Sequence, residues 1–113
     1  MPETWGIGVD LCAVSRMARA IEKAHFFTRV FTENERDYLQ GRGRAVGQSA
    51  AAMFAAKEAV AKALGTGFAQ GVMPWQIEVT HEQSGKPGVL LTGAAREKFE
   101  QIGGLSLIHI SEP

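Results

Sequence analysis

The sequence predicts an α+β fold, in which helices pack against a small and mostly antiparallel sheet. Three segments carry apolar residues at helical spacing, and Gln76–His81 alternates apolar and polar residues as a half-buried strand does. The turn sequence Ser84–Pro87 separates this strand from a second apolar run, Val89–Leu91, and so predicts a β-hairpin. The length of 113 residues is typical of one domain, which we expect to span residues 1–113.

The composition indicates an ordinary globular protein. Hydrophobic residues make up 45% of the chain, and twelve basic residues balance twelve acidic ones. This zero net charge argues against a general nucleic-acid or membrane-surface partner. The single cysteine, Cys12, fits a reducing compartment, and we see neither a secretory signal nor a segment apolar enough to span a bilayer. We therefore expect a cytoplasmic protein whose small core favours oligomerisation.

The first third of the chain predicts a strand and a helix. Ile7–Leu11 is a short apolar run that we interpret as the first strand. Helical spacing of apolar residues then predicts an amphipathic helix over residues 14–24. The outward face of this helix carries Arg16, Arg19 and Lys23, which favours either a solvated surface or a docking strip for an acidic partner.

The next segment begins with a helix start signal. Thr32 and Glu35 have the spacing of a capping box, so a short helix should begin there and run towards Leu39. The basic loop that follows contains Arg42 and Arg44, and it suits either a phosphate site or a plain connection.

A long central helix is predicted from Ser49 to Leu64. Ser49 is a suitable N-cap, and Gly65 is a suitable residue just beyond the C-terminal end. A further amphipathic helix is predicted over 93–102, and a last strand begins at Leu105–Leu107.

The central helix is rich in alanine, which indicates burial, yet it contains Lys57, Glu58 and Lys62. A buried carboxylate needs a partner, because an unpaired charge costs several kcal/mol, roughly the stability of a small domain. Three partners are consistent with the sequence: Lys62 one turn away, a basic residue elsewhere, or a divalent cation shared with Asp10. Magnesium prefers hard oxygen ligands and commonly uses one or two carboxylates.

Two motifs resemble those of a known family. Ile7-Gly8-Val9-Asp10 is similar to the G-x-D motif of the 4′-phosphopantetheinyl transferases, and Phe54–Lys62 matches their aromatic-x-x-K-E-A/S-x-x-K motif. Ala63–Gly67 and the Gly85-Lys86-Pro87 turn resemble the short bacterial branch, the holo-acyl-carrier-protein synthases. The resemblance runs from Gly6 to Leu107.

The resemblance implies a reaction and a site. Such enzymes transfer the phosphopantetheine arm of coenzyme A to a serine of apo-acyl carrier protein and release adenosine 3′,5′-bisphosphate, in fatty-acid synthesis. Asp10 and Glu58 would be the ligands of Mg²⁺, which neutralises charge on the pyrophosphate. Asp10, Glu58 and Lys62 would be the catalytic residues, with Glu58 accepting the serine proton directly or through a metal-bound water. Lys62 would stabilise the developing charge or protonate the leaving phosphate.

The same resemblance implies contacts around this centre. Coenzyme A would be bound by Lys57, by the turn Gly65, Thr66 and Gly67, and by His109. The strip of Arg16, Arg19 and Lys23 would receive acyl carrier protein, since a basic face steers an acidic partner. The implied assembly is a homotrimer with its active sites at subunit interfaces.

The sequence departs from the family pattern in two places. Met53 stands where members usually have an arginine or similar residue, so we expect Arg42 or Arg44 to supply that phosphate contact. Residues 108–113 lack the alanine- and valine-rich last strand, and we interpret them as truncated or non-native. Two alternatives to catalysis follow: an inactive remnant that still docks carrier protein, or a structural Glu58–Lys62 pair without metal.

Overall fold

The computed structural model describes residues 11–81 and 84–103. The elements within these residues are α1 (Leu11–Ala20), α2 (Ala24–Val30), α3 (Glu33–Gln40), the 3₁₀ helix η1 (Gly43–Ala45), α4 (Val46–Ala63), the 3₁₀ helix η2 (Pro74–Gln76), β1 (Ile77–His81), β2 (Pro87–Leu91) and α5 (Gly93–Gln101). The predicted α+β class is confirmed.

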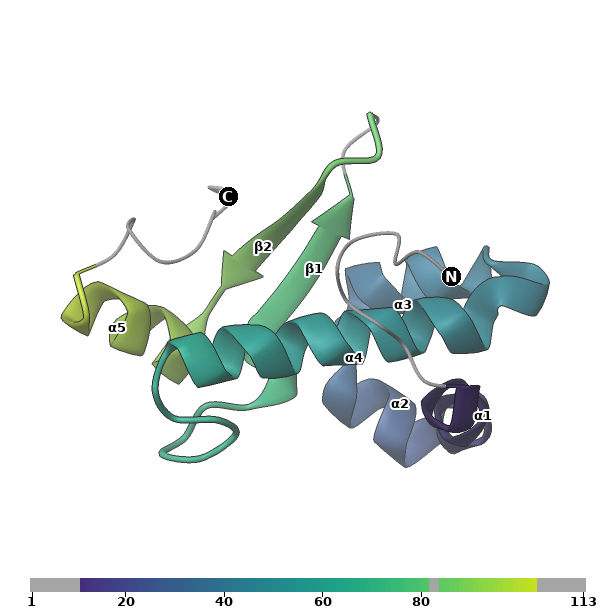
Figure 1. Ribbon diagram of the computed structural model, residues 1–113, viewed down its shortest axis with the longest axis horizontal. Coiled ribbons are helices and arrows are strands. Elements are labelled where there is room, and N and C mark those ends of the chain that lie inside the picture. Colours follow the sequence, from purple (N-terminus) through teal and green to yellow (C-terminus); the bar gives the residue numbers. More distant parts are fainter. Residues whose placement is uncertain (1–10, 82–83, 104–113) are drawn as a thin grey trace.

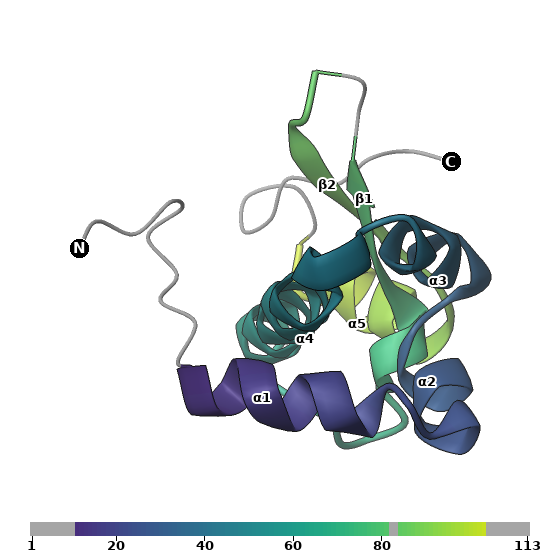
Figure 2. The same ribbon diagram turned by 90° about the vertical axis from the view of Figure 1, so that its right-hand side faces the viewer.

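Helix α4 runs through the middle of the molecule and organises the other elements (Figure 1). Helices α1, α2 and α3 lie around its N-terminal half, and α5 lies near its C-terminal end. The second view shows α1 crossing α4, with the β-hairpin rising beyond the helices (Figure 2). The crossing is close because Gly47 has no side chain: a Cβ there would lie 2.9 Å from the Cβ of Ala18.

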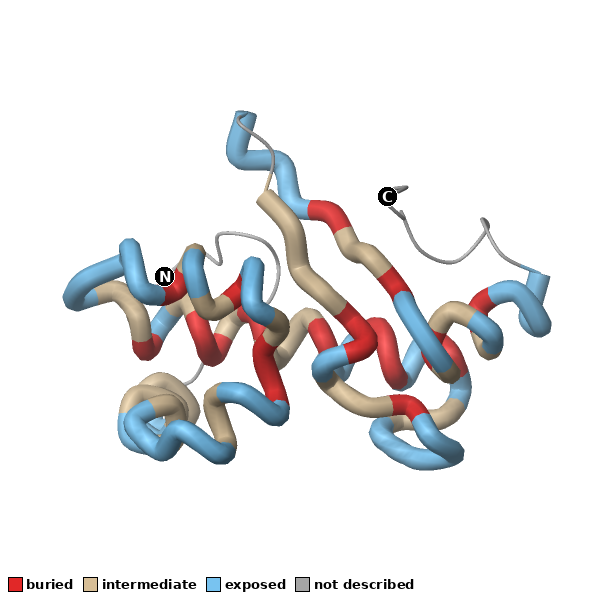
Figure 3. The backbone as a smooth tube through the Cα atoms, turned by 180° about the vertical axis from the view of Figure 1, so that it is seen from behind, coloured by how far each residue is buried: buried red, intermediate tan, exposed pale blue. Residues whose placement is uncertain are grey.

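Buried residues form two clusters, one at each half of α4 (Figure 3). The first joins the C-terminal half of α4 to the hairpin and α5, and its members are Val60, Ala61, Leu64, Val72, Ile77, Leu91, Ala95 and Phe99. The second joins the N-terminal half to α2 and α3, and its members are Val30, Phe31, Leu39, Ala50 and Met53. Both clusters hold α4 by apolar burial, which is favourable but non-directional.

The predicted hairpin is confirmed. Strands β1 and β2 pair antiparallel, with Ile77 opposite Leu91 and Val79 opposite Val89. The strand boundaries differ slightly from the prediction, because Gln76 belongs to η2 and β2 already begins at Pro87. The predicted strand over Leu105–Leu107 lies outside the described residues.

The prediction of one helix over residues 14–24 is wrong at both ends. Helix α1 begins at Leu11, although the sequence predicts this residue in the first strand. Leu11 is 83% exposed. The helix ends at Ala20, where the i→i+3 bonds from Glu22 N–H to Arg19 O and from Lys23 N–H to Ala20 O tighten the turn. Lys23 is the N-cap residue of α2, so it does not continue the line of Arg16 and Arg19.

The capping box is confirmed, whereas the predicted start of the central helix is wrong. Thr32 Oγ1 accepts from Glu35 N–H at 3.2 Å, and Glu35 Oε1 accepts from Thr32 N–H at 2.9 Å. Helix α4 begins at Val46 and continues directly from η1, without a side-chain cap. Ser49 is one turn inside the helix, where its Oγ accepts a hydrogen bond from Arg42 Nε at 3.1 Å.

The end of α4 agrees with the prediction. Gly65 follows the C-cap residue Leu64 with a φ of 85°. Gly65 N–H donates to Lys62 O, and Thr66 N–H donates to Ala61 O, which is the bonding pattern of a Schellman motif.

Within the described ranges, no helix has both the length and the hydropathy needed to cross a bilayer.

Candidate active site

One face of α4 presents the residues of the predicted reaction. Phe54, Glu58 and Lys62 are spaced four residues apart and therefore line up along the helix. Glu58 and Lys62 are exposed, while Phe54 is partly buried and its ring lies 6.0 Å from that of Phe68 in the following loop. The carboxylate and the ammonium group thus face solvent beside an aromatic pair.

Our premise that Glu58 is buried was wrong. Alanine on α4 marks both buried and half-exposed positions, and the turn of about 100° per residue places Glu58 on the outer side. The ion pairs found in residues 11–81 and 84–103 are Lys57–Glu35 and Arg96–Glu100, so Glu58 is not paired with Lys62. The structural Glu58–Lys62 pair is therefore absent.

Lys57 is the charge that α4 buries. Its side chain is fully inaccessible, and its Nζ donates to Glu35 Oε1 at 2.7 Å, to Pro74 O at 2.9 Å and to Ile77 O at 2.6 Å. An ammonium group has three hydrogens, and all three are used. The ring of Phe31 lies 5.6 Å from Nζ and completes the enclosure.

The carboxylate of Glu35 is also hydrogen-bonded through both of its oxygens. Besides Lys57 Nζ and Thr32 N–H on Oε1, it accepts from Val79 N–H through Oε2 at 2.7 Å. Burial lowers the pKa of Lys57, while the charge and the hydrogen bond of Glu35 oppose that shift. The pair connects α3, α4, η2 and β1. We had expected Lys57 to hold the phosphates of coenzyme A, but in this structure its three donors are occupied by the protein.

The turn after α4 is open on its outer side. Gly65 and Gly67 have positive φ values, of 85° and 58°, and a Cβ at either position would meet nothing within 4 Å. Glycine is favoured here by the backbone conformation rather than by a close neighbour within the chain. Thr66 Oγ1 donates to Gly67 O at 2.7 Å. The exposed backbone begins at Gly65, about two helical turns after Glu58 and three residues after Lys62.

The other predicted site residues lie elsewhere. Arg42 and Arg44 precede the N-terminal end of α4, whereas Glu58 lies about 18 Å further along its axis at 1.5 Å per residue. One chain therefore does not bring these arginines to the face that carries Glu58. Arg16 and Arg19 are exposed on α1.

Asp10 and His109 lie outside the described residues, so the predicted convergence of Asp10 with Glu58 stays a prediction. No cluster of three or more histidine, cysteine or acidic side chains suited to a metal occurs in the part of the chain that the structure describes.

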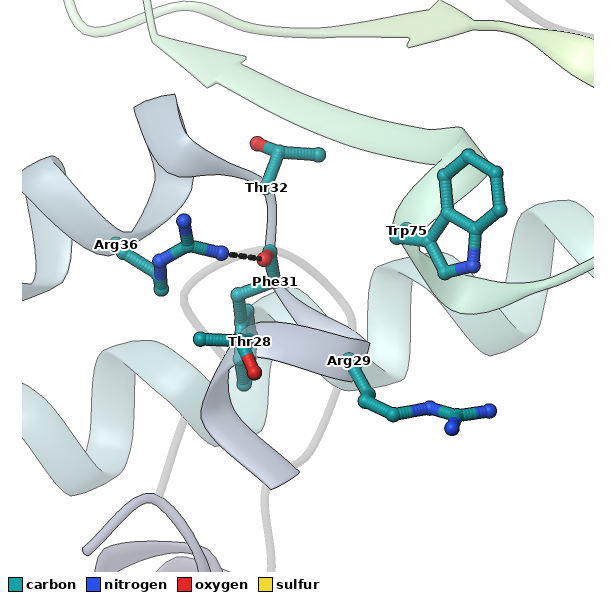
Figure 4. A pocket seen from close by; sticks show the side chains of 6 residues that line it. All are labelled: Thr28, Arg29, Phe31, Thr32, Arg36 and Trp75. Atoms are coloured by element: carbon teal, nitrogen blue, oxygen red, sulfur yellow. Dashed lines mark hydrogen bonds between the residues drawn. The ribbon is translucent and has the colours of Figure 1, made fainter. Parts of the chain in front are cut away.

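A separate cleft lies on the α2–α3 side of the molecule (Figure 4). It has a volume of about 460 Å³ and is lined by Thr28, Arg29, Phe31, Thr32, Arg36 and Trp75. Arg36 Nη1 donates to Phe31 O at 2.6 Å, and this bond holds the junction between α2 and α3. The lining includes none of the predicted site residues.

Comparison with known proteins decides the family. The family model of the 4′-phosphopantetheinyl transferase superfamily matches residues 6–106. The chain belongs to this superfamily.

Relatives and solved structures agree with this membership. A holo-[acyl-carrier-protein] synthase of Methylorubrum populi is 50% identical over 111 residues, which cover 94% of this chain and 81% of the relative. A holo-[acyl-carrier-protein] synthase of Ruminiclostridium cellulolyticum is 43% identical over 109 residues, which cover 91% of this chain and 81% of that relative. The crystal structure of holo-[acyl-carrier-protein] synthase from Neisseria meningitidis has a TM-score of 0.67 at 34% identity, over 80% of this chain and 74% of that one. A Plasmodium yoelii acyl carrier protein synthase with ADP bound has a TM-score of 0.63 at 28% identity, covering 80% and 71%.

Within this transferase fold, Glu35 is the partner of a predicted site residue, Lys57, that the sequence analysis does not identify. The capping box predicted its place at the start of α3 but gave no indication of a second partner. A signal was present, because a lysine in an alanine-rich helix needs a carboxylate if it is buried. The departure at Met53 also has a local explanation. Its side chain is 4% exposed and packs in the cluster around Phe31 and Leu39.

The ring of His81, the last residue of β1, stacks on the ring of Tyr38 of α3. Its ring lies 4.2 Å from that of Tyr38 at an interplanar angle of 5°, and the guanidinium group of Arg42 lies 5.4 Å from the centre of the Tyr38 ring. Burial lowers the pKa of His81 from 6.5, the charge of Arg42 lowers it further, and Glu35 opposes the shift. Protonation of His81 is therefore less favourable in the folded protein than in the unfolded chain.

We expect His81 to make stability depend on pH. Because its folded pKa is lowered, the unfolded chain binds more protons, so the contribution is present above pH 6.5 and is lost as pH falls through the folded pKa. His81→Phe should keep an aromatic ring on Tyr38 while flattening the fall in melting temperature between pH 7.5 and 5.5. Arg42→Gln should flatten it in part. An equal fall in melting temperature between pH 7.5 and 5.5 for the wild type and His81→Phe would contradict this assignment.

Proposed function

We propose that this chain transfers the 4′-phosphopantetheine arm of coenzyme A to a serine of apo-acyl carrier protein, as a holo-[acyl-carrier-protein] synthase of cytoplasmic fatty-acid synthesis. The observation that carries the proposal is the α4 face, where exposed Glu58 and Lys62 lead into the open Gly65–Gly67 turn. Family membership and the names of the relatives support the same activity. They favour catalysis over an inactive remnant that only docks carrier protein.

The reaction is an in-line displacement at phosphorus. The serine oxygen forms a bond to the phosphorus that carries the pantetheine arm, and the bond from that phosphorus to the bridging oxygen breaks. Adenosine 3′,5′-bisphosphate leaves with the bridging oxygen. We assign the proton of the serine to Glu58, directly or through water, and the stabilisation of charge on the leaving phosphate to Lys62. Such a reaction depends mainly on positioning and on charge stabilisation.

The donor set suits a magnesium ion. Glu58 offers hard carboxylate oxygens to solvent and has no ion pair in the described part of the chain. We propose Glu58 and Asp10 as its protein ligands; when bound, Mg²⁺ neutralises charge on the pyrophosphate. The Gly65–Gly67 turn, with Thr66, would then admit the pantetheine and phosphate groups close to the backbone.

The basic face of α1 is our proposed docking surface for acyl carrier protein. Arg16 and Arg19 are one turn apart and both exposed, and exposed Lys23 follows in the turn before α2. A cationic helix face steers an acidic partner and chiefly raises the rate and specificity of association.

We further propose a homotrimer that shares its sites between chains. Within one chain Arg42 and Arg44 are about 18 Å from Glu58 along α4, so we assign the arginines and the Glu58 of each shared site to two different copies. His109 is included in our proposed nucleotide contacts on the basis of the sequence motif alone.

Mass spectrometry tests the activity. Wild-type protein, coenzyme A and Mg²⁺ should add about 340 Da to apo-acyl carrier protein, the mass of the transferred arm. Glu58→Gln should slow the transfer at least about 100-fold, because the carboxylate is removed without change of shape. Glu97→Gln, an exposed change on α5, serves as the matched control. Absence of the added mass with wild-type protein would refute the proposed function.

Charge reversal tests the docking surface. Arg16→Glu should raise the KM for carrier protein about tenfold while leaving kcat and coenzyme A affinity close to wild type. The effect should shrink as salt is added, because exposed charges are screened. Lys86→Glu, an exposed reversal on the hairpin, is the control. An equal KM for the two variants would argue against α1 as the docking face.

Mixing two inactive variants tests the shared site. We expect Glu58→Gln and the double variant Arg42→Ala/Arg44→Ala each to be nearly inactive. Co-expressed in equal amounts, they should recover about one quarter of wild-type activity, since one interface in four joins an intact Glu58 to intact arginines. Sedimentation should show three copies per particle. A monomer, or a mixture without recovery, would contradict the shared site.

A further inference from the structure

The packing of α4 leaves its rotation weakly determined by shape. Four of its seven buried residues are glycine or alanine, namely Gly47, Ala50, Ala51 and Ala61. Small side chains allow close contact but provide few projections that interlock with neighbouring elements. Apolar burial adds free energy without direction. A directional contact is therefore needed to fix how α4 is turned about its own axis.

Lys57 supplies that contact. In the part of the chain that the structure describes, it is the α4 side chain that hydrogen-bonds to three other elements: Glu35 of α3, Pro74 O of η2 and Ile77 O of β1. Glu35 is itself held in place, because its carboxylate caps α3 and also accepts from Val79 N–H. Charge-assisted hydrogen bonds are short and directional, so Nζ fixes both the rotation and the axial position of α4 at this point.

Glu58 follows Lys57 and must turn with it. A side-chain carboxylate lies about 6 Å from the helix axis, so a rotation of about 20° would move it by about 2 Å. Misplacement by about 1 Å can cost about 100-fold in rate, and Mg²⁺ accepts only near-ideal ligand geometry. The orientation of Glu58 is thus sensitive to the bonds made by Lys57, which projects about 100° away around the helix.

We propose that Lys57 and Glu35 are positioning residues for the transfer reaction, holding α4 so that Glu58 and Lys62 face the reacting phosphate. This inference rests on the proposed function and assigns the buried charge pair to orientation rather than to substrate contact. Neither residue touches substrate in this scheme, since both side chains are fully buried. Their effect on the reaction passes through α4.

Three variants separate orientation from stability. Lys57→Met leaves a buried carboxylate without its counter-charge, and the melting temperature should fall by more than about 10 °C. Lys57→Met/Glu35→Gln removes both charges and should recover at least half of that loss. Its kcat should nevertheless stay at least about tenfold below wild type, with the KM for carrier protein unchanged. Arg96→Met/Glu100→Gln makes the same changes in the exposed pair on α5 and should keep wild-type kcat.

A distance measurement reports the orientation of α4 without relying on activity. Spin labels at Ala59→Cys on α4 and Glu97→Cys on α5, in a Cys12→Ser background diluted with unlabelled protein, give the distance distribution between two exposed positions. The neutral double variant should shift or broaden that distribution. Lys57→Arg provides a variant that keeps the buried charge but changes its geometry, and it should show the same change if the double variant does not fold.

The outcomes are distinct. A stable double variant with low kcat and an altered label distribution supports the positioning pair. Wild-type kcat in the double variant, or a label distribution identical to that of wild type, overturns it. If wild-type protein transfers nothing, the proposed function fails, but the label distribution still decides whether Lys57 orients α4.

Discussion

The buried pair of Lys57 and Glu35 is the constraint on which the arrangement of the other elements depends. Two opposite charges in the interior are costly unless each is fully hydrogen-bonded, and here both are. No buried side-chain nitrogen or oxygen within the described residues lacks a partner. Removing one member of such a pair costs about 3–5 kcal/mol. The pair also satisfies the carbonyl groups of Pro74 and Ile77, so it determines where the chain enters β1.

This constraint explains how an alanine-rich helix can present the proposed catalytic face. The small residues let α1 and the hairpin approach α4 closely, as the contact of Gly47 with Ala18 illustrates. Close approach of small residues is favourable but non-directional. The ammonium group of Lys57 fixes the rotation of α4 in which Glu58 and Lys62 are exposed. The exposed face ends in a turn of positive-φ glycines, where backbone rather than side chain meets solvent.

The parts of the fold that could be predicted from the sequence are those with local causes. The capping box at Thr32, the hairpin and the end of α4 at Gly65 each follow from a few neighbouring residues. The break after Ala20 and the start of α4 at Val46 have no such signal. They depend on how α1 and α2 bury Phe31 and its neighbours against α4, which is a long-range requirement. The convergence of Asp10 with Glu58 is likewise long-range, and it stays a prediction.

The three charges of α4 show why the site itself was only partly predictable. Lys57 and Glu58 are adjacent in sequence, yet one is fully buried and the other exposed, because each step along a helix turns the side chain by about 100°. The sign and spacing of charges do not reveal which of two neighbours faces the interior when alanine surrounds both. The decision rests with Glu35, 22 residues earlier, whose carboxylate can reach only one of them. A carboxylate already fixed by a helix cap is a suitable counter-ion, since little further freedom is lost when the lysine joins it.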